Sequence, residues 1–267
     1  MRISLRASLL PLAVALAATM PLSAGQSPQS APRVNGPTDP TGTFSILGFD
    51  PATGEIGAAV HSRVFSVGNG VLWAEAGLGA VATQAIVDVS YGPKSMELLK
   101  QGMAPKDIIA KVLADDPDPG YRGQKWQKAG RQFAVMNAKG EFAAHTGPEA
   151  TPWAGDKQGK YCTAQGNILA GEAVVQNMVD AFEKSALDAN GRPNHISYRL
   201  QAALEAGDAA GGDTRGKQSA AMIVVKKDGG VWLHNDVVLR LQVDDNPEPI
   251  KELRRLVDLA ARQRPRR

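Results

Sequence analysis

The chain changes character abruptly at Thr43. Residues 25–42 (GQSPQSAPRVNGPTDPTG) are mostly Gly, Pro, Ser and other polar residues and offer almost nothing to a hydrophobic core. From Thr43 the residues alternate in polarity through residue 49, a pattern that favours a β-strand. We therefore expect a folded domain, placed at residues 43–262, that opens on a strand directly behind a disordered leader or propeptide at residues 25–42.

The beginning of the chain has the pattern of a secretory signal. Arg2 and Arg6 precede an apolar run at residues 9–22, and the small residues Ser23, Ala24 and Gly25 follow it. The run contains two prolines and is shorter than the roughly 20 apolar residues that a spanning helix needs. The sequence predicts a signal peptide at residues 1–24 and a periplasmic or secreted protein without a stable membrane anchor.

The net charge of +3 arises from the two ends of the chain. Without Asp39, the three arginines of the signal and leader and the four arginines of the C-terminal end, which includes a basic tail at residues 263–267, 23 basic and 26 acidic residues remain. This balance gives no reason to expect a nucleic-acid partner. The sequence leaves the oligomeric state open, so a homo-oligomer is one possibility.

Cysteine and histidine usage limits the chemistry. The single cysteine, Cys162, cannot form an intramolecular disulfide. The four histidines have no metal-ligand spacing, and the glycines near residue 212 do not form a phosphate-binding motif. We therefore expect neither a metal nor another cofactor.

Strand and helix patterns alternate along the domain. Hairpins are predicted at residues 43–62, 132–145 and 219–235, and further strands at 79–87, 161–168 and 239–243. Apolar residues at helical spacing predict helices from Ser90, from Pro105, and at residues 171–185, 195–205 and 249–262. Because hairpins imply antiparallel pairing, this order predicts an α+β domain of packed sheets covered by helices.

Thr43 is the first candidate for chemistry. If the bond between Gly42 and Thr43 is cut, Thr43 gains an α-amine with a pKa near 8, which can act as base for its own hydroxyl. Gly42 leaves room for that hydroxyl to attack the upstream carbonyl. Threonine is also simply common in strands, and the residues alone favour this second interpretation.

A series of ordered segments extends from Thr43 to about Leu256. The segments are TFSI (43–46), DPATGEIG (50–57), WAEAGLGAVATQ (73–84), SYGP (90–93), AHTG (144–147), WAG (153–155), QGNILAG (165–171), GGDTRGKQSAA (211–221) and VDDNP (243–247). In this order they resemble the DUF1028 family (domain of unknown function 1028), which is placed in the superfamily of N-terminal-nucleophile (Ntn) hydrolases.

The resemblance implies both a fold and an activity. The fold is a four-layer αββα sandwich of two mainly antiparallel sheets covered by helices. The activity is hydrolysis of an amide or small peptide-like substrate by an N-terminal threonine. Family members often begin at the position of Thr43, directly after the initiator Met, so the resemblance favours Thr43 as the nucleophile.

This chain departs from the family pattern in two places. A signal and a leader precede Thr43, which must therefore be exposed by cleavage, whether autoproteolytic or not. The segment NDVV at residues 235–238 stands where the family more usually has an Asp-Arg pair, so a substrate-facing arginine is missing there.

Two further residues are candidates for the catalytic group. Asn167, beside the flexible Gly166, resembles the oxyanion donors of other Ntn enzymes; the alternative is a turn in which Asn167 satisfies local backbone. His61 ends the returning strand, where it could tune the amine or contact substrate. The alternative for His61 is a half-buried side chain with a backbone partner.

Four polar residues are candidates for substrate binding. Asp213 and Arg215 lie in a glycine-rich loop, where a planar guanidinium beside a carboxylate suits either a substrate carboxylate or a structural salt bridge. Gln84 and Gln218 are further polar candidates.

Two other functions stay open at this point. If the leader is never removed, the domain is a catalytically silent periplasmic binding module. Cys162 with His145 or His61 would instead make a thiol-dependent hydrolase, although a small buried residue is the commoner role for a lone cysteine.

Overall fold

The computed structural model describes residues 42–118, 120–121, 123, 126–150 and 152–263. The predicted signal, the leader up to residue 41 and the tail after residue 263 lie outside the described residues. None of the helices in the described ranges combines the length and the apolar character that a membrane-spanning segment requires.

The first sheet has six antiparallel strands, and β1 lies inside it. Their order across the sheet is β10 (Val237–Val243), β9 (Ser219–Val225), β2 (Glu55–Ser62), β1 (Thr43–Asp50), β8 (Cys162–Asn167) and β7 (Gly155–Gly159). In the register of β1, Thr43 lies opposite Ser62 on one side and opposite Asn167 on the other. Thr43 is therefore flanked by the last residues of two neighbouring strands.

The second sheet has four antiparallel strands and packs on the first. Its order is β3 (Leu72–Glu75), β4 (Gly79–Ala85), β5 (Arg131–Asn137) and β6 (Phe142–Thr146). The buried apolar side chains between the sheets include Leu47 of β1, Val60 of β2 and Ala82 of β4.

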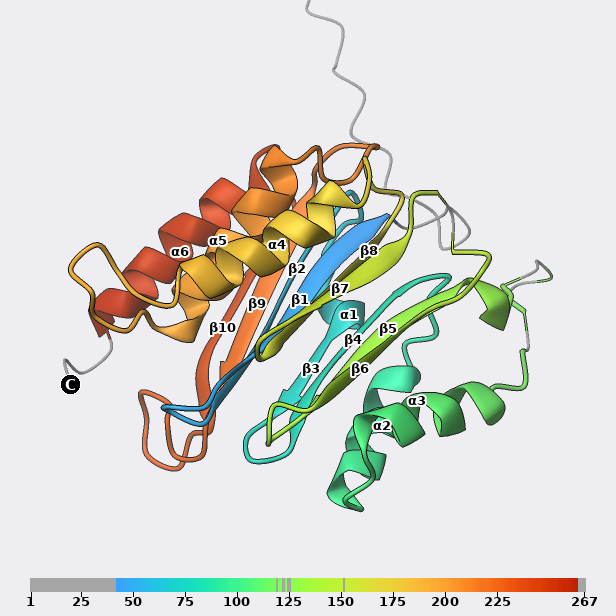
Figure 1. Cartoon of the computed structure of the whole chain (residues 1–267), viewed down its shortest axis with the longest axis horizontal. Coiled ribbons are helices and arrows are strands. Elements are labelled where there is room, and N and C mark those ends of the chain that lie inside the picture. The colour runs from blue at the N-terminus through green and yellow to red at the C-terminus, as the bar shows by residue number, and fades with distance from the viewer. Residues whose placement is uncertain (1–41, 119, 122, 124–125, 151, 264–267) are drawn as a thin grey trace, which may run out of the picture. The chain divides into compact units, whose positions relative to one another are not determined.

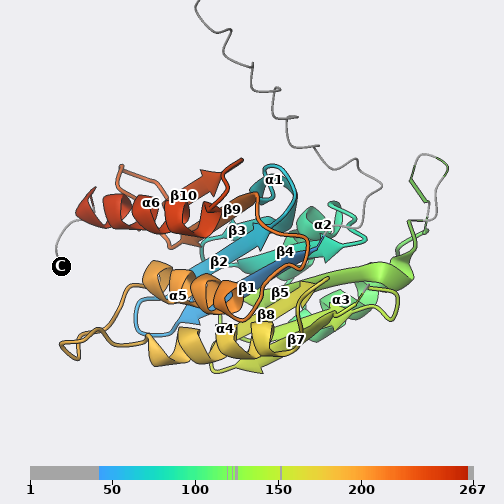
Figure 2. The ribbon, with the colours of Figure 1, turned by 90° about the horizontal axis from the view of Figure 1, so that it is seen from above.

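Helices cover the outer face of each sheet (Figures 1 and 2). The six-stranded sheet carries α4 (Ala173–Lys184), α5 (Ile196–Ala209) and α6 (Pro249–Gln263). The four-stranded sheet carries α2 (Tyr91–Lys100) and α3 (Pro105–Ala114). Two shorter helices are α1 (Gly68–Val71) and the 3₁₀ helix η1 (Lys128–Gly130). The four layers are helices, sheet, sheet and helices, which confirms the predicted αββα class.

The alternation of β1 decides which way its side chains point. Phe44 and Ile46 are buried in the core beneath the helices of the six-stranded sheet, whereas Leu47 and Phe49 are buried between the sheets. Because strand side chains alternate, Thr43 and Ser45 also face the space between the sheets.

The predicted strand at the end of the last hairpin is wrong. β9 pairs with β10, and not with residues 231–235. Trp232 and Leu233 are 78% and 91% exposed in the connecting loop, whereas Val238 and Leu239 are buried in β10. The apolar residues of the loop thus follow the sequence pattern of a strand, although their side chains do not pack against a core.

Candidate functional site

Thr43 presents its hydroxyl to a second hydroxyl. Its Oγ1 donates a hydrogen bond to Ser62 Oγ over 3.1 Å. The contact follows from the register of the first hairpin, which sets the two residues opposite each other. Thr43 is 2% exposed and Ser62 is fully buried, so this pair is shielded from water.

The carbonyl oxygen of Gly42 accepts two hydrogen bonds. Ser62 Oγ donates one over 2.5 Å, and Arg215 Nη2 donates the other over 2.7 Å. The carbonyl of the bond that precedes Thr43 is thus held by one neutral and one charged donor. Charge-assisted bonds of the second kind are the stronger class.

Asp213 fixes the guanidinium of Arg215. Its Oδ1 accepts from the backbone N–H and the Nε of Arg215, and its Oδ2 accepts from Nη2 over 2.7 Å. The Asp213 carboxylate is fully buried, whereas the Arg215 side chain is 23% exposed. The salt bridge that the sequence allowed is present, and the arginine also reaches beyond it to Gly42.

The loop that carries Asp213 and Arg215 depends on glycine. Gly211, Gly212 and Gly216 have φ values of +107°, +50° and +112°, which side chains with a Cβ rarely adopt. This backbone lets the loop leave α5, pair at Leu169↔Asp213 and enter β9.

A buried polar layer lies between the sheets next to Thr43. Gln84 accepts from Ser45 Oγ and donates to Gln132, and its Nε2 lies 3.4 Å from the carbonyl oxygen of Thr43. Asn167 donates its amide to Gln132 over 3.0 Å. Gln84 is therefore an internal residue of the sandwich, buried with its amide engaged.

Asn167 lies beside Thr43, but its side chain is used elsewhere. The amide that we expected at the oxyanion goes to Gln132, and the hydrogen bonds recorded at the Gly42 carbonyl come from Ser62 and Arg215. Gln218 likewise accepts from Arg63 and donates to Asp245, which ties together the loops after β2 and β10.

His61 faces away from the hydroxyl of Thr43. It lies opposite Phe44, and the two rings pack 4.8 Å apart on the helix side of the sheet. It is fully buried, and neither ring nitrogen has a hydrogen-bond partner among the described residues. Burial lowers its pKa to about 4, against an upward effect of Asp213 and Asp208. His61 therefore forms no hydrogen bond with Thr43, and its ring is fully buried without a backbone partner, unlike the half-buried ring of the alternative. Its role in tuning the amine or contacting substrate stays a prediction.

Cys162 is a core residue. It is fully buried at the start of β8, in the cluster beneath α4 and α5. Burial, reinforced by Glu183, raises the pKa of its thiol to about 12, so the thiol stays protonated at neutral pH. A nucleophilic cysteine needs the thiolate, and this environment disfavours it.

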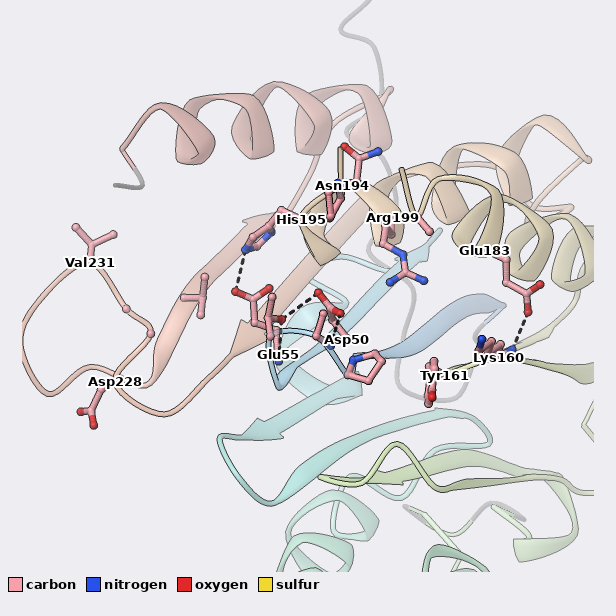
Figure 3. Close-up of a pocket in the computed structure, with 18 residues that line it drawn as sticks. Asp50, Glu55, Lys160, Tyr161, Glu183, Asn194, His195, Arg199, Asp228 and Val231 are labelled. Atoms are coloured by element: carbon pink, nitrogen blue, oxygen red, sulfur yellow. Dashed lines mark hydrogen bonds and ion pairs between the residues drawn. The ribbon is translucent and has the colours of Figure 1, made fainter. Parts of the chain in front are cut away.

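A cavity of about 1100 Å³ lies at the opposite end of β1 (Figure 3). Asp50, Glu55 and Arg199 line it, together with His195, whose Nε2 lies 3.3 Å from Glu55. Seven residue-to-residue steps of extended strand lead from Thr43 to Asp50, about 23 Å at roughly 3.3 Å per step. Thr43 lines neither this cavity nor a smaller one of about 250 Å³ beside β3 and β10.

Metal chemistry has no visible site in the part of the chain that the structure describes. Among those residues no group of three or more His, Cys, Asp or Glu side chains could hold a metal ion.

Ser62 is the site residue that sequence reasoning missed. The hairpin turn at residues 51–54 pairs Asp50 with Glu55, and counting outward from that pair sets Ser62 opposite Thr43. The same count puts His61 on the other face. The register was thus readable from the sequence, whereas the approach of Arg215 from a distant loop was not.

Two of three comparisons with known proteins find proteins similar to this chain. The model of a family of unknown function, DUF1028, matches residues 43–253. A crystal structure of a DUF1028 protein from Silicibacter pomeroyi is 32% identical, with a TM-score of 0.70 over 82% of this chain and 89% of that one. A search of curated proteins finds no match.

Two further solved structures are much less similar. Anbu (ancestral beta-subunit) from Yersinia bercovieri is 11% identical, with a TM-score of 0.34 over 84% of this chain and 99% of that one. Anbu from Hyphomicrobium sp. strain MC1 is 9% identical, with a TM-score of 0.31 over 83% and 95%.

Proposed function

The chain belongs to the DUF1028 family, and we propose that it is an exported Ntn-type hydrolase whose nucleophile is an N-terminal Thr43. Its substrate would be an amide or a small peptide-like molecule. The export step rests on the signal-like residues 1–24, and the compartment would be the periplasm or the exterior.

One observation supports the nucleophile most strongly. The Thr43 hydroxyl, the Ser62 hydroxyl and the Gly42 carbonyl form a continuous chain of hydrogen bonds of 3.1 and 2.5 Å. A candidate nucleophile, a group able to relay its proton and an amide carbonyl therefore lie together at the start of β1. A threonine that only opens a strand requires no such arrangement.

The reaction would proceed in two steps, formation of an acyl-enzyme and its hydrolysis. The freed α-amine of Thr43 takes the hydroxyl proton while Oγ1 bonds to the substrate carbonyl carbon. The carbon–nitrogen bond breaks, and the proton leaves with the departing amine. Water then attacks the ester, its proton returns to Oγ1, and the acid is released.

Burial of Thr43 is consistent with a precursor. With Gly42 attached, the nucleophile is 2% exposed. Loss of the residues up to Gly42 would both create the amine and leave an empty position in front of Ser62 and Arg215. The Arg215 side chain is 23% exposed, so that position would be reached from solvent on its side.

Replacement of Thr43 tests the proposal. We expect Thr43→Ala to abolish hydrolysis of a panel of N-acetyl amino-acid 4-nitroanilides, a loss of at least 1000-fold in kcat/KM. Thr43→Ser should keep measurable turnover because it retains the hydroxyl. Circular dichroism melting curves should show both variants folded.

The outcome also separates the alternatives. Equal turnover by Thr43→Ala and the unaltered protein would rule out Thr43 as the nucleophile. Activity that depends on Cys162 and is lost in Cys162→Ser would favour the thiol enzyme, and ligand binding without any turnover would favour a silent binding module.

A further inference from the structure

The groups around Gly42 define more than a cleavage site. If Thr43 attacks the Gly42 carbonyl, the product is an ester between Gly42 and Thr43 Oγ1 with a free α-amine on Thr43. That species has the same bonds as the acyl-enzyme formed from an external amide. Whatever holds the Gly42 carbonyl is therefore in place to hold the carbonyl of a substrate.

Two donors already hold that oxygen. Ser62 Oγ lies at 2.5 Å and Arg215 Nη2 at 2.7 Å, and both donate to it. The hydroxyl is fully buried, and the guanidinium is fixed on the buried carboxylate of Asp213 by bonds of 3.1 and 2.7 Å. Donors that are fixed before reaction stabilise negative charge on such an oxygen more effectively than mobile ones.

The same groups leave no space beside the α-carbon of Gly42. A Cβ built on this residue would lie 2.9 Å from Arg215 Nε, from Arg215 Nη2 and from Asp213 Oδ1. These atoms cannot easily move away, because each takes part in the Asp213–Arg215 pair. An acyl group with a side chain at that carbon would have to break the ion pair or shift the carbonyl from its donors.

We propose that Ser62 and Arg215 are the carbonyl-holding residues for every amide that Thr43 attacks, and that the acyl part carries no side chain on the carbon next to its carbonyl, as in a glycyl amide. The inference rests on the proposed function of Thr43. It assigns the chain's own Gly42 as the first acyl group that the site processes.

Cleavage of the leader in the full-length chain gives the first test. Intact-mass spectrometry of the exported protein, followed over time, measures the fraction that begins at Thr43. We expect Gly42→Ala, Ser62→Ala and Arg215→Gln each to slow its formation at least tenfold, and Arg215→Lys to have a smaller effect.

Matched control variants distinguish an effect at the site from a loss of folding that any substitution could cause. Gly70→Ala replaces a glycine whose added Cβ meets only one ordinary contact at 3.4 Å, and Arg240→Gln replaces an exposed arginine on β10. Both should process like the unaltered chain, and thermal melting should show all variants folded.

Reactive esters test the acyl preference on the mature chain. The probes are the 4-nitrophenyl esters of N-acetylglycine and N-acetylalanine, and the readout is release of nitrophenol together with the mass gained on Thr43. After division by the rates of each ester with hydroxide, the glycine ester should react at least tenfold faster. Equal corrected rates would overturn the acyl preference.

The experiments distinguish a failure of Thr43 as nucleophile from a failure of Ser62 and Arg215 as carbonyl-holding residues. If the unaltered chain never begins at Thr43 and Thr43 is never acylated, the proposed function itself is wrong. If chains that begin at Thr43 form and react at the normal rate in Ser62→Ala and Arg215→Gln, then Ser62 and Arg215 do not hold the carbonyl. The role of Thr43 as nucleophile would be unaffected by that result. Cutting of Thr43→Ala at the same bond would show that another protease acts there, which also contradicts the roles of these two residues in maturation.

Discussion

At the scale of single residues, His61 shows how a side chain next to the site can be excluded from it. Its neighbour Ser62 faces Thr43, whereas His61 is turned to the opposite face and packs on Phe44. Burial holds the pKa of His61 near 4, so the ring is neutral at neutral pH. A neutral, enclosed imidazole lowers the free energy of unfolding only when the pH falls far enough for the ring to be protonated in the unfolded chain.

The stability of the protein should therefore depend on pH. Because the pKa of His61 is about 4 in the folded state and 6.5 in the unfolded chain, the unfolded state binds more protons between these values. The protein should therefore lose stability as the pH falls through this window, and His61 should account for about 2 kcal/mol of the loss between pH 7 and pH 4.5.

Urea unfolding at the two pH values measures the effect. His61→Leu should reduce the loss by that amount, while His234→Gln, in an exposed loop, should not. Identical losses in His61→Leu and the unaltered protein would show that His61 is not the group responsible.

At the scale of elements, close packing of helices on the first hairpin depends on small residues. A Cβ on Gly48 of β1 would lie 2.7 Å from the ring of Phe182 in α4, and a Cβ on Gly57 of β2 would lie 2.6 Å from Leu200 in α5. The glycines let both helices approach the strands that carry Thr43 and Ser62.

Gly48→Ala should therefore destabilise the fold by about 1–3 kcal/mol through overpacking. Phe182→Leu should be destabilising alone, because it opens a cavity, but the double variant should cost less than the sum of the two. Free energies from urea unfolding of the four proteins measure this coupling. Additive costs would mean that Gly48 and Phe182 do not compete for space.

The elements also show what the sequence could predict. The hairpin at residues 43–62 and the helices from Ser90 and Pro105 follow from clear periodicity and turn residues, and the structure confirms them. The sequence did not predict β7 (GDKQG), because this segment contains no apolar residue. It forms a strand by pairing with β8. Residues 231–235 were predicted as a strand because periodicity does not reveal exposure, and residues 231–234 are exposed.

At the scale of the whole molecule, Gln132 connects the two sheets. It lies in β5, accepts from Gln84 of its own sheet and Asn167 of the other, and donates to the carbonyl of Gly166 over 2.8 Å. The sequence predicted the four layers through its family resemblance. The polar residues between the layers could not be predicted, because strand patterns do not show which residues of two sheets meet.

Gln132→Leu should reduce the free energy of unfolding by at least about 2 kcal/mol, because several buried polar groups lose their partner at once. Gln158→Leu on β7 is the matched control, since Gln158 is exposed and its loss should stay within about 0.5 kcal/mol. Equal effects of the two changes in urea unfolding would contradict the connecting role of Gln132.

On this mechanism Thr43 becomes the first residue of the mature protein. Intact mass and N-terminal sequencing of the unaltered protein, produced from the full-length chain, measure where the mature chain begins. We expect a chain that begins at Thr43 with a free α-amine. A mature chain that begins upstream, for example at Gln26, and in which every molecule retains Gly42 would contradict it.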